Sequence, residues 1–162
     1  PLDGKILIML FEKPSTRTRI SFDLAVKQLG GKSLILNPDE IHYGTGDESL
    51  YDTAKVLSQY ADIVMLRTNA HKYAEQFSKY LDVPLINGLT DLSHPCQIMS
   101  DIMTFEELKG PIKNKKIAWL GDGNNIVYSL IEAAVQFEFE LSIASPKEYE
   151  PNKKILQCLK GT

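Results

Sequence analysis

Short apolar runs alternate with amphipathic stretches along the whole chain of 162 residues. The runs resemble strands buried on both faces, and the stretches repeat their apolar positions with the period of a helix. Strands are predicted at 5–10, 33–36, 62–66, 84–87, 116–120 and 141–144. Helices are predicted at 16–29, 48–60, 71–81, 95–108 and 124–137, with a last short helix near Pro151.

This alternation of strand and helix predicts parallel strands joined by right-handed crossovers, which build a doubly wound α/β sheet. Gly110 and Pro111 interrupt the pattern and mark a boundary between a lobe at 1–109 and a lobe at 110–162. The first lobe would be nearly complete, whereas the second would hold only two strands and two helices. Because so small a sheet cannot bury a core by itself, we expect the second lobe to be truncated and the natural polypeptide to continue past Thr162.

Composition and charge argue against several classes of function. Hydrophobic residues make up 43% and charged residues 24% of the chain, which is ordinary for a globular protein. The formal net charge of −3 gives no reason to expect nucleic acid or an anionic membrane as a partner. The apolar runs are too short to span a bilayer. Cys96, Cys158 and the three histidines are scattered, so we expect no metal site, and two lone thiols suit a reducing compartment.

The segment 11–19 carries the strongest chemical signal. It follows the first predicted strand and opens the first predicted helix with Ser15, Thr16, Arg17, Thr18 and Arg19. A helix N-terminus offers free backbone N–H groups and the positive end of the helix dipole, and arginine binds phosphate oxygens through paired hydrogen bonds. A capped helix with two solvated arginines explains Ser15 alone, because positive side chains in a first turn oppose the dipole. A bound anion removes that conflict, so we predict an anion site.

Two further strand ends carry polar side chains, and ligands of open α/β sheets bind beyond the carboxyl ends of the strands. Arg67 ends the third predicted strand, where a solvated arginine would be ordinary, and His71 is interpreted as structural. His94 lies at the predicted N-cap of the fourth helix, with Gln97 one turn later, so both side chains could face a cleft. A capping histidine and an exposed glutamine explain this pair equally well.

Gly121 and Gly123 half-match the dinucleotide-binding fingerprint. Ile126 stands where the third glycine would be, and no acidic residue closes the next predicted strand, where a ribose partner would lie. Nucleotide binding is therefore the weaker interpretation of this segment. Asn124 and Asn125 could instead present their amides to a polar zwitterion.

Taken together, the segments 15–19 and 94–97 and the residue Arg67 resemble the carbamoyl-phosphate site of the aspartate and ornithine carbamoyltransferase family. The resemblance runs over nearly the whole chain and includes the order and spacing of the motifs. Within the family, the segment 121–125 followed by Ser129 is similar to the ornithine branch, as is the segment 48–54.

The resemblance implies transfer of the carbamoyl group from carbamoyl phosphate to the side-chain amine of L-ornithine, giving L-citrulline and phosphate in arginine or urea-type metabolism. It implies that the phosphate is held by Ser15, Thr16, Arg17 and Thr18. It also implies that the carbamoyl end is surrounded by Arg67, His94 and Gln97, with Arg67 and His94 catalytic. Asn125 matches the family position that contacts ornithine.

The same resemblance implies a homotrimer without metal or organic cofactor, in the cytoplasm or, in an animal, the mitochondrial matrix. His42 resembles a loop residue that reaches a neighbouring subunit's site in some members, although an ordinary loop histidine explains it equally well. The family's N-terminal helices and the later motifs of its second lobe are absent, so we expect the chain alone to be nearly inactive. Alternatives are a non-catalytic remnant that binds carbamoyl phosphate, or a carbamoyltransferase for putrescine, an acylated ornithine or aspartate.

Overall fold

The computed structural model of the chain describes residues 1–37, 48–153 and 155–156. The chain falls into two compact units, Pro1–Thr90 and Asp91–Thr162. His42 and Cys158 lie outside the described residues, so the prediction for His42 stays a prediction.

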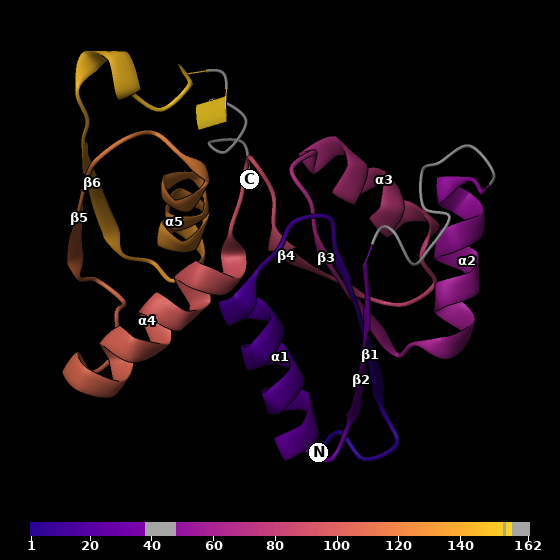
Figure 1. The fold of residues 1–162 in the computed structure, drawn as a ribbon. Helices are drawn as coiled ribbons and strands as arrows, with labels where there is room; N and C mark the ends of the chain where they lie inside the picture. The colour runs from indigo at the N-terminus through magenta and orange to yellow at the C-terminus, as the bar shows by residue number, and fades with distance from the viewer. Residues whose placement is uncertain (38–47, 154, 157–162) are drawn as a thin grey trace. The chain divides into compact units, whose positions relative to one another are not determined.

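A parallel four-stranded sheet forms the centre of the first unit (Figure 1). The strand order is β2-β1-β3-β4, so the first strand of the chain lies inside the sheet between the second and the third. All three pairings are parallel. The bounds agree with the predicted strands to within two residues: β1 (Ile6–Phe11), β2 (Lys32–Leu36), β3 (Ile63–Arg67) and β4 (Leu85–Leu89).

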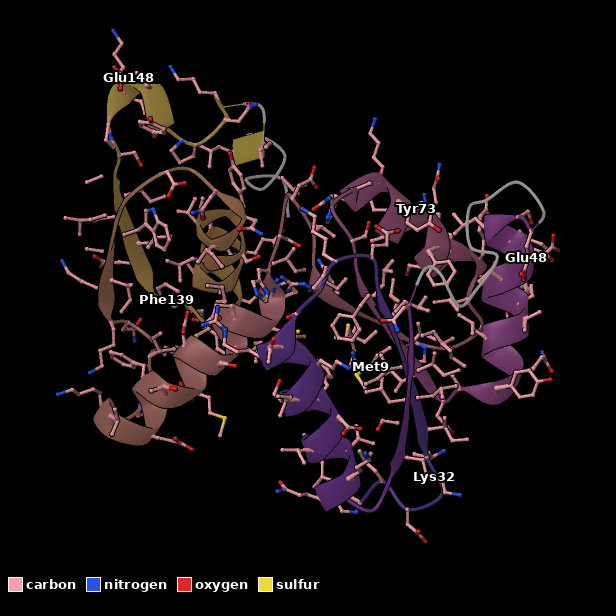
Figure 2. The ribbon with its side chains drawn as sticks, viewed as in Figure 1. Met9, Lys32, Glu48, Tyr73, Phe139 and Glu148 are labelled. Atoms are coloured by element: carbon pink, nitrogen blue, oxygen red, sulfur yellow. The ribbon has the colours of Figure 1, made fainter. Side chains whose placement is uncertain are left out.

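Helices cover both faces of this sheet. Helices α2 (Leu50–Tyr60) and α3 (His71–Tyr80) pack on one face, where Leu57 and Phe77 share a core with Leu66. Helix α1 (Thr16–Gln28) covers the opposite face, where its residues Phe22 and Val26 pack against a cluster that includes Met9 and Met65 (Figure 2). The predicted doubly wound α/β architecture is therefore confirmed.

Helix α2 begins two residues later than predicted because Ser49 is its N-cap. The Ser49 hydroxyl accepts a hydrogen bond from the backbone N–H of Asp52 at 3.1 Å and donates one to the Asp52 carboxylate at 2.6 Å. A serine in this position satisfies a backbone donor that the first turn leaves without a helical partner.

An ion pair and a hydrogen bond, both to Asp62, join the amino ends of β1 and β3. The Asp62 carboxylate accepts hydrogen bonds from the Lys5 ammonium at 2.8 Å and from the Ile6 backbone N–H at 2.9 Å. The hydrogen bond from Lys5, and after it the one from Ile6, holds the pKa of Asp62 below its ordinary value. A depressed carboxyl pKa stabilises the fold above the pKa of the unfolded chain and is lost as the pH falls through the folded value.

We therefore expect Asp62→Asn to lower the free energy of unfolding at pH 7, and the deficit relative to the wild type to shrink below about pH 4, where aspartates of an unfolded chain protonate. Urea unfolding at pH 7 and at pH 3 measures both values. Asp3→Asn is the matched control, because Asp3 is exposed and forms no ion pair with a described residue. A deficit that stays constant between the two pH values would contradict the assignment.

The second unit pairs only two described strands, β5 (Lys116–Leu120) and β6 (Glu140–Ala144), in parallel. One face of this pair packs on α4 (Pro95–Lys109) and α5 (Asn125–Gln136), in a core that contains Ile102 and Ala133. Side chains alternate along both strands, and on the other face Leu120 is 79% exposed. The short 3-10 helix η2 (Lys147–Tyr149) follows β6. The two-stranded second lobe predicted from the pattern is thus what the described residues form.

By packing, α4 belongs to the second unit, because its residues Ile98 and Ile102 lie in the same core as Phe139. The sequence-based division at 109/110 places this helix in the first lobe and stays a prediction. No helix in the described ranges is long and apolar enough to cross a membrane.

Candidate active site

The N-terminus of α1 presents donors for which the described residues supply no side-chain partner. Ser15 is the N-cap in an extended conformation, yet its hydroxyl makes no capping hydrogen bond, and the first turn contains no acidic residue. Among the described residues, no carboxylate forms an ion pair with Arg17. Arg17 is exposed, whereas Ser15 and Thr18 are half-buried. A positive helix end with unengaged hydroxyl and guanidinium groups is suited to a bound anion.

Arg67 is the last residue of β3 and lies at the carboxyl end of the first unit's sheet, the end from which the chain leads into α1. In the parallel register Phe11 of β1 pairs with Arg67 of β3, and the Glu12 N–H donates to the Arg67 carbonyl at 3.0 Å. The segment that leads into α1 therefore starts beside Arg67. The backbones of these two strand ends are therefore adjacent, and the grouping of their side chains in one site stays a prediction.

The Arg67 side chain is half-buried, and the described residues leave part of its guanidinium without a hydrogen-bond partner. Its Nε is buried without a hydrogen-bond partner among the described residues, and burial lowers the pKa of the guanidinium. Arginine stays protonated despite such a shift. The pairing of β3 with β4 shifts register between Leu66 and Arg67, an irregularity that often re-aims a side chain near a functional site. A buried donor without a partner calls for a ligand or water.

His71, by contrast, is engaged by its own unit. Its Nδ1 lies 2.8 Å from the hydroxyl of Thr90, and its Nε2 lies 3.8 Å from the Glu75 carboxylate on the same helix. Thr90 is fully buried directly after β4. These contacts agree with the structural interpretation of His71, since the ring connects the start of α3 to the end of a neighbouring strand.

His94 and Gln97 lie at the start of α4 in the second unit. His94 is the N-cap, as predicted, but its side chain does not cap the helix. Its backbone N–H donates to the hydroxyl of Ser129 at 2.8 Å, and Ser129 is only 3% exposed on α5. Gln97 is exposed, and its Nε2 donates to the Asp101 carboxylate at 2.9 Å.

Sequence reasoning missed the contacts of Ser129 and Asp101. In the sequence Ser129 is only a marker of the family branch, and its burial on α5, which implies a polar partner, is visible only in the structure. Since Asn125 and Ser129 share a face of α5, the helix that begins with the predicted ornithine residue is tied to the backbone of His94. This arrangement lies entirely within the second unit.

The side chain of Asn124 caps helix α5. Its Oδ1 accepts hydrogen bonds from the backbone N–H groups of Ile126 at 2.9 Å and Val127 at 3.3 Å, and its Nδ2 donates to Asp122 at 3.0 Å. Asn124 is therefore the N-cap of α5, and the helix starts one residue later than predicted. The hypothesis that the Asn124 amide is presented to a ligand therefore gives way to a capping role, and the assignment of Asn125 stays a prediction.

We expect Asn124→Ala to lower the free energy of unfolding by about 1–2 kcal/mol, because two N–H groups of the first turn lose their acceptor. Urea unfolding monitored by circular dichroism measures the loss. Asn124→Ser is the matched control, since a serine hydroxyl can accept the same capping bond and should retain most of the stability. Equal losses in both variants would contradict the capping role.

Gly123 serves the packing of the chain. A Cβ on Gly123 would lie 2.5 Å from the backbone of Pro151, and the Gly123 N–H donates to the Tyr149 carbonyl at 2.7 Å. Glycine is required because the segment after β6 passes directly over it. This close approach explains Gly123 of the partial dinucleotide fingerprint without a nucleotide.

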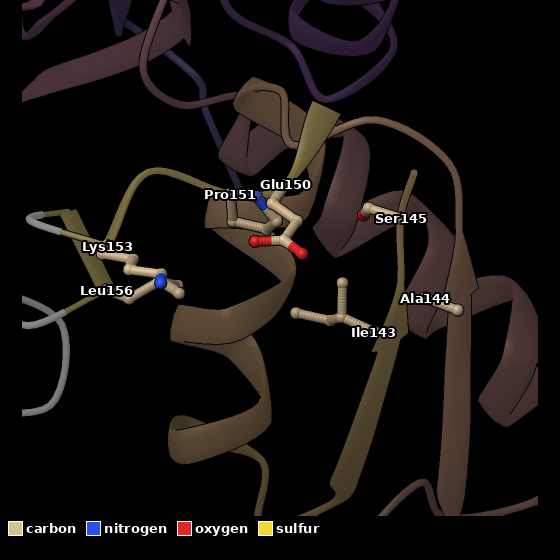
Figure 3. Close-up of a pocket in the computed structure, with 7 residues that line it drawn as sticks. All are labelled: Ile143, Ala144, Ser145, Glu150, Pro151, Lys153 and Leu156. Carbon is tan, nitrogen blue, oxygen red and sulfur yellow. The ribbon is translucent and has the colours of Figure 1, made fainter. Parts of the chain in front are cut away.

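A cavity of about 340 Å³ opens at the carboxyl end of β6 in the second unit (Figure 3). The Ser145 hydroxyl there is buried without a hydrogen-bond partner in the described part of the chain. The cavity contains none of the predicted site residues: its lining is Ile143, Ala144, Ser145, Glu150, Pro151, Lys153 and Leu156.

The described residues hold no cluster of three or more histidine, cysteine, aspartate or glutamate side chains that could bind a metal ion. Cys96 lies between His94 and Gln97 in the first turn of α4, and burial raises the pKa of its thiol. A raised pKa keeps the thiol protonated and a poor nucleophile near neutral pH.

Two family models match the chain and together cover almost all of it. The model described as "Aspartate/ornithine carbamoyltransferase, carbamoyl-P binding domain" matches residues 1–107. The model described as "Aspartate/ornithine carbamoyltransferase, Asp/Orn binding domain" matches residues 113–162. The chain belongs to the aspartate/ornithine carbamoyltransferase family. The resemblance stated from the motifs alone is thereby confirmed.

Relatives within this family bear the name of its ornithine branch. The ornithine carbamoyltransferase of Brucella ovis is 53% identical over 156 residues, which cover 96% of this chain and 50% of that protein. The ornithine carbamoyltransferase of Mesorhizobium japonicum is 53% identical over 161 residues, which cover 99% of this chain and 53% of that protein. The chain thus spans about half the length of the curated relatives it matches.

Solved structures of the carbamoyltransferase family share the fold. The ornithine carbamoyltransferase from Pyrococcus furiosus superimposes with a TM-score of 0.90 at 47% identity, covering 98% of this chain and 50% of that one. The catalytic subunit of M. jannaschii aspartate transcarbamoylase superimposes with a TM-score of 0.81 at 40% identity, covering 99% of this chain and 54% of that one.

Proposed function

We propose that the protein carrying this chain transfers the carbamoyl group of carbamoyl phosphate to the side-chain amine of L-ornithine. The products are L-citrulline and phosphate. The observation that carries the proposal lies at the carboxyl end of the first unit's sheet. The segment that leads into α1 starts beside Arg67, and no carboxylate of the described residues forms an ion pair with Arg17 or Arg67. Membership of the carbamoyltransferase family gives that anion its identity, and the names of the relatives favour ornithine as the acceptor.

The phosphate group is assigned to the start of α1. Its backbone N–H groups and dipole attract negative charge, and the Arg17 guanidinium can hold two phosphate oxygens at once. These donors would also stabilise the charge that the phosphate gains as it departs. The proposed phosphate ligands are Ser15, Thr16, Arg17 and Thr18.

The carbamoyl end is assigned to Arg67, His94 and Gln97. The ornithine amine attacks the carbamoyl carbon, and negative charge develops on the carbonyl oxygen before the bond to phosphate breaks. Arg67 and His94 would donate to that oxygen, as the donors of an oxyanion hole do. The amine loses its proton as the new C–N bond forms, and the departing phosphate can accept it. Holding the two substrates in reacting geometry contributes further, by up to roughly 7–11 kcal/mol in well-oriented systems.

Asn125 is assigned to ornithine, and His42 to a contact with a neighbouring subunit's site. We further propose that the protein is a homotrimer and acts in arginine metabolism, in the cytoplasm or in the mitochondrial matrix of an animal. Residues 1–109 would form its carbamoyl-phosphate domain, and residues 110–162 the start of its ornithine domain. Family resemblance supports these assignments, and sedimentation equilibrium tests the trimer.

The test of the function is product formation by the natural polypeptide supplied with carbamoyl phosphate and L-ornithine. We expect citrulline and phosphate in equal amounts. Putrescine, N-acetylornithine and aspartate, offered in parallel, test the acceptor, and we expect each to react far more slowly. Faster reaction with one of them would replace ornithine in the proposal. Binding of carbamoyl phosphate without any product would favour the non-catalytic remnant, and no binding would overturn the proposal.

A further inference from the structure

We propose that Asp101 is a positioning residue that fixes the orientation of the Gln97 amide, so that Gln97 offers its oxygen to the amino group of carbamoyl phosphate. This inference rests on the proposed function, because it takes Gln97 as a ligand of the carbamoyl end. It adds to the proposed site a residue, Asp101, that touches no substrate. It also gives a reason why the site would bind carbamoyl phosphate more tightly than acetyl phosphate.

The first step is the chemistry of the contact. The Gln97 side chain lies 2.9 Å from Oδ1 of Asp101, one helical turn further along α4. An ionised carboxylate only accepts hydrogen bonds, whereas a carboxamide has one donating end and one accepting end. The atom of Gln97 that faces Asp101 must therefore be Nε2. The usual ambiguity between the two ends of an amide is removed by the charge of its partner.

The second step concerns the other end of the amide. With Nε2 held by Asp101, Oε1 is directed away from that carboxylate, and no described residue donates to it. Gln97 lies in the first turn of α4, where backbone N–H groups already supply donors. Oε1 of Gln97 adds an acceptor beside these donors. The amino group of a carbamoyl moiety is a donor and fits such an acceptor.

The third step is selectivity. Acetyl phosphate has the same phosphate and carbonyl groups as carbamoyl phosphate, but a methyl group replaces the amino group. The proposed phosphate ligands bind both molecules alike, and only carbamoyl phosphate can donate to Gln97. A Gln97 amide whose orientation is already fixed by Asp101 therefore favours carbamoyl phosphate. An amide that is free to rotate loses conformational entropy when the ligand binds, which reduces this preference.

A Gln–Asp pair four residues apart also stabilises a helix by itself. The test needs a readout that helix stability does not change. That readout is the ratio of the dissociation constants for acetyl phosphate and carbamoyl phosphate, measured by calorimetry with each compound on the natural polypeptide. Loss of helix stability weakens both ligands together and leaves the ratio unchanged.

We expect Asp101→Asn to lower this ratio roughly three- to tenfold, because an asparagine amide can pair with either end of Gln97 and no longer fixes it. Asp101→Glu restores a carboxylate and should recover most of the preference. Glu107→Gln is the matched control, since it neutralises another exposed carboxylate of α4 and should leave the ratio as it is. In a Gln97→Ala background, Asp101→Asn should have no further effect on the ratio.

The outcomes separate this inference from the proposed function. A wild-type ratio that falls in Gln97→Ala but is unchanged in Asp101→Asn overturns the role of Asp101 and leaves Gln97 in the site. A wild type that does not bind carbamoyl phosphate, or does not prefer it to acetyl phosphate, overturns the assignment of Gln97 and the inference with it. Thermal unfolding of each variant establishes that the compared proteins are folded, and the isosteric Asp101→Asn keeps the test usable if Asp101→Glu is destabilised.

Discussion

Arg67→Ala is expected to lower kcat for citrulline formation by roughly 10²- to 10³-fold, the usual effect of removing one oxyanion donor. Its Nε is already buried without a hydrogen-bond partner among the described residues, so the donor is desolvated before substrate binds. The guanidinium therefore undergoes little reorganisation as charge develops on the carbamoyl oxygen. Steady-state kinetics with saturating carbamoyl phosphate measures kcat directly.

Lys72→Ala is the matched control for Arg67, because it removes an exposed cation from the first turn of the helix that follows β3. We expect it to change kcat by less than about twofold, as surface substitutions away from a site usually do. A kcat for Arg67→Ala close to that of the control would remove Arg67 from the reacting end of the site.

Arg17→Ala is expected to weaken carbamoyl-phosphate binding by about 2–4 kcal/mol, which corresponds to a roughly 30- to 1,000-fold rise in Kd. The phosphate would lose a paired, charge-assisted contact, and no carboxylate of the described residues now pairs with Arg17 to be released in compensation. Isothermal calorimetry with carbamoyl phosphate measures the change, and inorganic phosphate should show a loss of similar size.

Arg19→Ala is the matched control for Arg17, two residues along the same helix. The charge of Arg19 acts on Asp23, where it helps to hold the pKa of that carboxyl below its ordinary value, after the larger effects of Ser33 and Lys27. We therefore expect a much smaller loss of affinity from this variant. Equal losses from the two variants would mean that the helix end attracts phosphate through its overall charge, without a specific contact to Arg17.

The α/β architecture could be predicted because strands buried on both faces leave an unbroken apolar run. The run 5–10 differs from β1 by one residue at each end, since the last apolar residue, Phe11, also pairs in the sheet. The helix starts were harder. Ser49 and Asn124 are N-caps, and the side chain that caps a turn lies just outside the periodic pattern that predicts the helix.

The site residues were predicted from residue type and spacing, whereas the partners that come from other elements of the fold could not be. Nothing in the local sequence shows that Ser129 accepts the His94 N–H, because that contact joins two helices. The need for glycine at position 123 likewise arises from the approach of Pro151, which is a tertiary feature. The Gln97–Asp101 pair was within reach, since residues four apart on a helix are neighbours.

The strand order β2-β1-β3-β4 also determines when the proposed phosphate site, at the start of α1 and beside Arg67, can form during folding. Strand β1 has both of its neighbours in place only once β3 has paired with it. The ion pair between Lys5 and Asp62, at the start of these two strands, joins residues 57 positions apart in the chain. Closing so long a loop delays the central pairing relative to the local helices. Carbamoyl phosphate would then find its site only after this step, so the ligand should slow unfolding of the first unit and leave its folding rate nearly unchanged.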